Sequence, residues 1–204
     1  MTRIRSISLA VVLTMALMFT ALSALAPRVQ ATHMPADKIG VSASTIEVMD
    51  TTQPQPVTLL TATLRTSSPT DLMIKVTGEC ALWTNVSSPD GLAQANVKVW
   101  VEIDGAPVPV TSDPAQGGPD DGKVVFCNRE FQVVSIVDVL QLFLRTRAAQ
   151  AFNWVTLNVG SGIHTIEVKA RLDTLVAGAA VAKAAVGKRT LIVEPAKLAN
   201  DITI

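Results

Sequence analysis

Apolar and polar residues alternate with a period of two along most of the chain, which is the pattern of half-buried β-strands. The clearest run is Ala95, Val97, Val99, Val101 and Ile103. Residues 163–172 alternate in the same way, and residues 71–77 do so over a shorter stretch. Each of these segments has one apolar face and one polar face. The pattern therefore predicts antiparallel sheets that are covered on one side and solvated on the other.

Turn residues separate the predicted strands. Asp104-Gly105 directly follows the 95–103 strand, and both central positions of a type I′ turn need a positive φ, so a hairpin is expected here. The returning segment, 106–110, contains Pro107 and Pro109, which have no N–H to donate and favour a sheet edge. Gly160-Ser161-Gly162 predicts a second hairpin between strands 152–159 and 163–172.

Residues 136–150 depart from the period of two. Ile136, Val139, Leu140 and Phe143 lie at helical spacing, and Ser135 is a suitable N-cap. We therefore expect an all-β chain, an antiparallel β-sandwich with one short amphipathic helix. Jelly-roll and immunoglobulin-like topologies both fit this order of elements.

The first 31 residues have the three-part layout of a secretory signal peptide. Arg3 and Arg5 precede an apolar run from Ile7 to Ala26, and Val29-Gln30-Ala31 offers small residues at a cleavage site. Cleavage after Ala31 would leave a flexible lead-in at 32–44 and a single sandwich domain at 45–204. The alternative is an uncleaved anchor, because the apolar run is long enough to span a bilayer. Either reading predicts an extracytoplasmic, most simply secreted, protein.

Cysteine content and charge agree with that compartment. Cys80 and Cys127 are the only cysteines, and an even number in an exported chain predicts a disulfide. Residues 1–31 contain three arginines and no acidic residue, so the remaining chain is mildly acidic. A mildly acidic chain without a basic stripe is a poor partner for nucleic acid.

Two tryptophans are candidates for a ligand platform. Trp100 and Trp154 each lie in the otherwise polar phase of their predicted strands. Two outward rings could stack on a sugar. The alternative is that the predicted 136–150 helix covers this face and buries both rings. The chain has no Tyr, which sugar-binding surfaces also use.

Metal and catalytic motifs are weak. Asp113, Asp120 and Asp121 share a Gly/Pro-rich loop and form a weak candidate for calcium, with no EF-hand spacing. His33 falls in the lead-in and His164 in the apolar phase of a strand, which gives no zinc-ligand pattern. Asn85 begins an N-glycosylation sequon. Gly160-Ser161-Gly162 lacks the spacing and the helix of a nucleophile elbow.

These observations favour a secreted, non-enzymatic β-sandwich with a structural, cell-surface or protein-interaction role. Its partner would be a cell-envelope or matrix protein, and the Ala-rich stretch 177–185 is a candidate for strand addition to another subunit. We expect no cofactor. The first alternative is a carbohydrate-binding module that uses Trp100 and Trp154 on a polysaccharide. The second is a secreted hydrolase with an unrecognised site.

Overall fold

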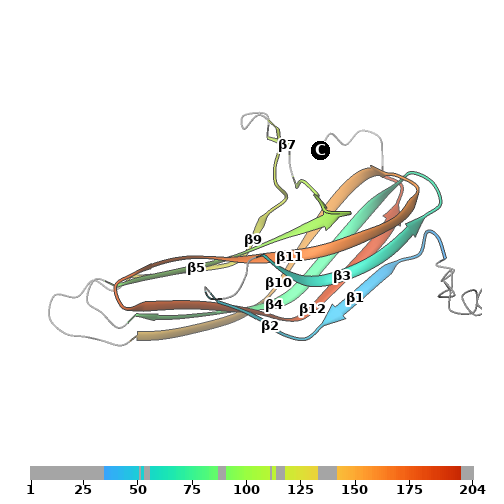
Figure 1. Cartoon of the computed structure of the whole chain (residues 1–204). Helices are drawn as coiled ribbons and strands as arrows, with labels where there is room; N and C mark the ends of the chain where they lie inside the picture. Colours follow the sequence, from blue (N-terminus) through green and yellow to red (C-terminus); the bar gives the residue numbers. More distant parts are fainter. Residues whose placement is uncertain are drawn as a thin grey trace, which may run out of the picture. The chain divides into compact units, whose positions relative to one another are not determined.

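The computed structural model describes residues 35–50, 52, 56–86, 91–110, 112–113, 118–132 and 142–198. Within these ranges the regular elements are β-strands, arranged as two antiparallel five-stranded sheets and a small two-stranded one (Figure 1). This confirms the all-β, sandwich-like prediction. In the described part of the chain there is no helix long and apolar enough to cross a membrane.

The first sheet, called sheet A, has the order β1-β12-β4-β10, with the short β2 also paired to β12. Its strands are β1 (Gly40–Ser44), β2 (Glu47–Met49), β4 (Thr70–Val86), β10 (Leu142–Val159) and β12 (Ala180–Ala196). The lead-in was expected to extend to residue 44, but residues 40–44 form β1 and pair with residues 189–193 of β12. Pairing with a long neighbour gives this short segment backbone partners that its sequence alone does not reveal.

The second sheet, called sheet B, has the order β3-β11-β5-β6, with β9 also paired to β5. Its strands are β3 (Val57–Thr66), β5 (Leu92–Ile103), β6 (Ala106–Pro107), β9 (Val124–Gln132) and β11 (Gly162–Ala177). The small third sheet joins β7 (Ser112–Asp113) to β8 (Gly118–Pro119). The β5–β6 hairpin has the expected turn, since φ is 52° at Asp104 and 83° at Gly105.

The core lies between sheets A and B and is built by alternate residues of the long strands. The inward, fully buried positions include Leu72 and Ile74 of β4, Val97, Val99 and Val101 of β5, and Ile166 and Val168 of β11. These are the faces that the period of two predicts. Burial of each such side chain contributes about 1.5–3 kcal/mol to folding.

The Cys80–Cys127 disulfide links the two sheets. Cys80 lies on β4 and Cys127 on β9, and the Cα atoms are 6.3 Å apart, within the usual range for a disulfide. The predicted bridge is therefore present. Because 47 positions separate the two cysteines, the bridge closes a long loop in the unfolded chain.

The predicted helix at 136–150 is wrong for the part that the structure describes. Residues 142–150 are the first half of β10 and pair in continuous register with β4, from Leu142 opposite Val86 to Gln150 opposite Gly78. Residues 136–141 lie outside the described ranges. Apolar residues at helical spacing are a weak signal when a long strand is available for pairing, because tertiary context overrides local preference.

A buried arginine fastens the edge of sheet A to sheet B. Arg189 is only 4% exposed and follows Lys188, whose φ of 43° marks a bulge in β12. Its guanidinium donates to the backbone oxygens of Leu59 on β3 (2.8 Å) and Val186 on β12 (2.7 Å). Further bonds reach the Thr45 oxygen and the Ser44 hydroxyl, both at 3.3 Å. One side chain thus ties β1, β3 and β12 together.

One end of the sandwich is narrower than the other. We call it the distal part and define it as residues 79–86 of β4, 92–97 of β5, 171–177 of β11 and 180–187 of β12. β3 pairs with β11 only as far as Ala170, and β2 pairs with β12 only as far as Ala184. In Figure 1 the end of β11 and the start of β12, which belong to different sheets and are joined by a short turn, extend to the left beyond β3.

Candidate functional site

Trp100 and Trp154 do not form an open platform in this structure. Trp100 is 5% exposed and Trp154 is 1% exposed. The Trp154 indole N–H donates to the backbone oxygen of Gly122 (2.9 Å), and the Trp100 indole N–H donates to Glu102 Oε1 (2.8 Å). Both polar ends of the rings are occupied within the chain, so neither tryptophan is available to stack on a sugar.

A register shift explains the position of Trp154. Trp154 lies opposite the fully buried Ile74, so its ring faces the core. The pairing of β10 with β4 shifts between Thr156 and Val159, and Asn158 has a positive φ of 55°. A bulge reverses the phase of a strand. Val159 therefore also packs against the core, although the sequence places it in the phase opposite to Trp154.

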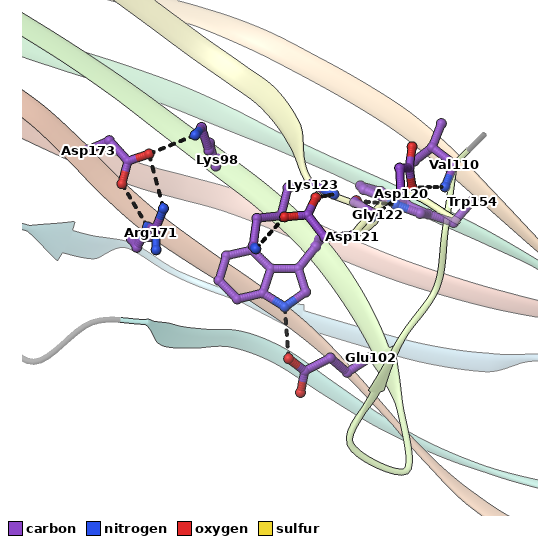
Figure 2. Close-up of polar contacts among 11 residues, drawn as sticks. Lys98, Glu102, Val110, Asp120, Asp121, Gly122, Lys123, Trp154, Arg171 and Asp173 are labelled. Atoms are coloured by element: carbon purple, nitrogen blue, oxygen red, sulfur yellow. Dashed lines mark hydrogen bonds and ion pairs between the residues drawn. The ribbon is translucent and has the colours of Figure 1, made fainter. Parts of the chain in front are cut away.

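The segment before β9, and not a helix, covers Trp100. The Lys123 ammonium lies 5.4 Å from the centre of the Trp100 ring, and it also pairs with Asp121. Gly122 has a φ of 67°, and a Cβ there would approach the Val108 oxygen to 2.0 Å, so only glycine fits this crossing. Figure 2 shows Asp121, Gly122 and Lys123 in this segment, with Trp154 beside Gly122.

Charged pairs cover the outer face of sheet B around Trp100. Lys98 and Arg171 both contact Asp173, at 2.9 and 2.7 Å (Figure 2). Lys169 bridges Glu102 and Glu167, at 3.2 and 3.3 Å. Charges that are already paired across neighbouring strands stabilise a solvated sheet face and leave little free charge for a ligand.

The aspartates of the candidate calcium loop have other partners. Asp120 Oδ1 accepts backbone N–H groups from Val110 (2.8 Å) and Gly122 (2.9 Å), which is turn chemistry. Asp121 binds Lys123, which lowers the pKa of the Asp121 carboxyl. The side chain of Asp113 lies outside what the structure describes. Among the described residues, His, Cys, Asp and Glu form no group of three that would hold a metal.

His164 of β11 makes a pair with Asp104 in the β5–β6 turn. The hairpin predicted at Gly160-Ser161-Gly162 is wrong, because these residues connect β10 of sheet A to β11 of sheet B and the two strands do not pair with each other. Its Nδ1 lies 2.7 Å from Asp104 Oδ2, and its Nε2 lies 2.9 Å from the backbone oxygen of Gly160. The hydrogen bond that the His164 ring donates to the Asp104 carboxylate is the main cause that raises the pKa of His164. Both ring nitrogens face acceptor oxygens, so both are engaged by contacts within the chain. His33 lies outside the described residues.

A different tryptophan, Trp83, is the one that meets solvent. Trp83 is partly exposed on the outer face of sheet A, opposite Lys183 of β12 and Arg145 of β10. A hollow of about 490 Å³ lies beside it. The residues that line the hollow are Val48, Trp83, Thr84, Asn85, Val181 and Lys183. Apolar walls with a few polar groups are typical of ligand sites.

Basic residues surround Trp83. The Arg145 guanidinium lies 5.3 Å from the ring centre, and among the described residues it has no carboxylate partner. Arg147, two positions further along β10, bonds to Glu79. Lys183 is only loosely paired, with its Nζ 3.8 Å from Asp50 Oδ2. Lys183 lines the hollow of about 490 Å³, whereas Arg145 and Arg147 line a smaller hollow that also contacts Trp83.

The sequence itself indicates that Trp83 lies on the outer face of its strand. Cys80, Leu82 and Thr84 share one phase of their strand, so Trp83 must face the other way. Its neighbours could not be inferred, because Val181 and Lys183 lie in the Ala-rich stretch whose sequence fits a helix or a strand equally well. The hollow exists only because that stretch becomes β12 and lies beside β4.

The distal part also exposes apolar residues along an open strand edge. Val176 is in the inward phase of β11 yet is 44% exposed, and the adjacent Leu175 is 55% exposed. Over residues 173–177, β11 pairs with β5 on one side and, among the described residues, with no strand on the other. Exposed backbone groups and apolar side chains at one edge are a template for an additional strand.

Comparison with known proteins gives little more. No protein-family model matches the chain, and no curated protein matches it. Among solved structures, the chain is similar to that of the Gt strain of infectious bursal disease virus, at 17% identity and a TM-score of 0.31, over 83% of this chain and 36% of that chain. For the Gx strain the identity is 16% and the TM-score 0.27, over 87% and 41%. The chain thus spans about two fifths of those chains or less, and at these TM-scores the likeness supports no conclusion about function.

Proposed function

We propose that this chain is a non-enzymatic, extracytoplasmic β-sandwich protein that associates with another protein chain by strand addition at its distal part. The observation that carries the proposal is the edge of β11 at 173–177, where Leu175 and Val176 are exposed and where, among the described residues, no strand pairs on the side away from β5. Main-chain hydrogen bonds would give such a contact its affinity, and the two apolar side chains would give it selectivity.

The order of strands supports a jelly-roll arrangement over an immunoglobulin-like one. Strands that follow each other along the chain change sheet at the β2–β3, β3–β4, β4–β5, β9–β10, β10–β11 and β11–β12 connections. The resulting orders, β1-β12-β4-β10 and β3-β11-β5-β9, are those of a double Greek key. A fold of this kind serves many roles, so the proposal rests on the exposed edge and not on the topology.

Two observations support the compartment and the absence of catalysis. The Cys80–Cys127 bridge is stable in an oxidising compartment, in agreement with the predicted leader at residues 1–31. The His164–Asp104 pair is the arrangement closest to a catalytic base and its orienting acid. Its second nitrogen, Nε2, bonds to the Gly160 oxygen, so it is engaged by the fold itself.

Light scattering during size exclusion tests the proposal on protein that begins at Thr32. We expect either concentration-dependent self-association or retention on cell-envelope fractions. Val176→Lys places a charge on the open edge and should weaken that association about tenfold. Ile163→Lys is the matched control, because Ile163 is an exposed residue of the same strand where β3 already covers the edge.

Two results would contradict strand addition. The first is a strict monomer at all concentrations with no envelope retention. The second is equal association of the Val176→Lys and Ile163→Lys proteins, which would move the contact away from the distal edge.

A further inference from the structure

The outer face of sheet A carries a hollow that the proposed strand addition does not use. Three of its lining residues, Val48, Trp83 and Val181, are apolar, and they come from three neighbouring strands, β2, β4 and β12. Its volume of about 490 Å³ falls within the range of small-molecule sites. Val48 is 43% exposed and Val181 is 51% exposed, so these walls meet water and not protein.

The hollow carries a positive charge that is only partly balanced by a neighbouring carboxylate. Lys183 lines the hollow itself, and its ion-pair partner among the described residues is Asp50, whose Oδ2 lies 3.8 Å from the Lys183 Nζ. Arg145 lies over Trp83 on the side away from Lys183. By contrast, Glu79 is already shared by Arg147 and Lys188. An anion in this hollow would therefore meet Lys183, whereas Arg145 lines a separate, smaller hollow that also contacts Trp83.

We propose that this hollow is a binding site for a small amphipathic anion, a carboxylate with an apolar body such as a medium-chain fatty acid. The apolar body lies against Trp83, Val48 and Val181, and the carboxylate pairs with Lys183. Burial of the apolar chain supplies most of the affinity, at about 0.8 kcal/mol for each CH₂ group removed from water. The charge selects the head group.

The sign of the ligand's charge is the first test. A fluorescent anilinonaphthalene sulfonate dye serves as the reporter, and octanoate, octanol and octylamine compete for it with the same chain and three different head groups. We expect octanoate to displace the dye at concentrations about tenfold lower than octanol does, and octylamine to be weakest. Equal displacement by all three would overturn the anion site, and so would a folded protein that binds no dye.

Single substitutions test whether octanoate binds in this hollow. Trp83→Ala and Lys183→Glu should each weaken octanoate binding about tenfold, and Lys183→Glu should leave octanol unaffected. Lys38→Glu is the matched control, since it makes the same charge change at an exposed position ahead of β1. If Trp83→Ala lowers the melting temperature, the exposed Lys183→Glu variant still decides the question. Octanoate affinity that is equal in the Lys183→Glu and Lys38→Glu proteins would refute the proposal.

The two proposed sites, the hollow on sheet A and the open edge of β11, can be tested independently of each other. Val176→Lys alters β11 of sheet B, whereas Lys183→Glu alters the outer face of sheet A. If the Lys183→Glu protein loses octanoate binding but still associates, the hollow is a binding site independent of strand addition. If the Val176→Lys protein loses association but still binds octanoate, the edge of β11 is an association site independent of the hollow.

Discussion

At the scale of single residues, the polar groups with the most partners serve the fold. Asp104 illustrates this, because one carboxylate closes a hairpin and orients His164. Its Oδ1 accepts the backbone N–H of Thr165 (2.8 Å), and its Oδ2 faces the imidazole. The hydrogen bond with His164 is the main cause that lowers the pKa of Asp104. The pair is therefore most stable when the histidine is protonated and the aspartate is ionised.

This pair predicts a stability that depends on pH in two ranges. Because the fold raises the pKa of His164, its contribution is complete below the ordinary value of 6.5 and is lost as pH rises through the folded pKa. Because the fold lowers the pKa of Asp104, its contribution is complete above 3.8 and is lost as pH falls through the folded pKa. NMR titration of the histidine ring should give a pKa above 6.5 that returns towards 6.5 in Asp104→Asn. An unchanged titration in that variant would show that Asp104 does not hold the proton on His164.

Arg189 gives a second prediction at this scale. Arg189→Met should lower the free energy of unfolding by about 3 kcal/mol, because the buried oxygens of Leu59 and Val186 lose their donor. Urea denaturation measures the change, and Lys188→Ala, at the exposed neighbouring position, is the control. Equal midpoints for the two variants would mean that Arg189 does not fasten β3 to β12.

At the scale of elements, the sequence predicts strands well where alternation is long and turns are distinctive. The 95–103 strand and its Asp104-Gly105 turn are found as expected, because local sterics and one apolar face specify both. The strand predicted at 152–159 is the second half of β10, but its first half could not be inferred, because it depends on pairing with a strand that is remote in sequence. Trp154 shows the same limit, since the bulge after Thr156 decides which side its ring faces.

The candidate site follows this rule. The phase of Trp83 can be deduced from Cys80 and Leu82, but the hollow beside it requires knowing that β12 and β2 are its neighbours. Likewise, Trp100 is in the outward phase, as expected, and is covered because Lys123 folds over it. The alternation of apolar and polar residues specifies which face of a strand each side chain lies on. Contacts between segments that are distant in sequence decide whether that face is covered or exposed.

At the scale of the whole molecule, the disulfide is the covalent link between the two sheets. Reduction should lower the free energy of unfolding by about 4 kcal/mol, because the unfolded chain regains the entropy of a long loop. Denaturation with and without dithiothreitol measures this difference, and the Cys80→Ala/Cys127→Ala protein should match the reduced form. Reduced and oxidised proteins with the same stability would show that non-covalent packing alone sets the alignment of the sheets.

The pairing of β1 with β12 has a consequence for attachment. Gly40, near the start of the described chain, lies opposite Val193, near its end. A tether attached before β1 or after β12 would therefore leave the domain at the same end, the end opposite the distal part. β12 has 17 residues, and at about 3.3 Å per residue it extends about 55 Å. A copy anchored at that end would hold Trp83 and the open edge of β11 well clear of its support, where molecules arriving from solution meet them first.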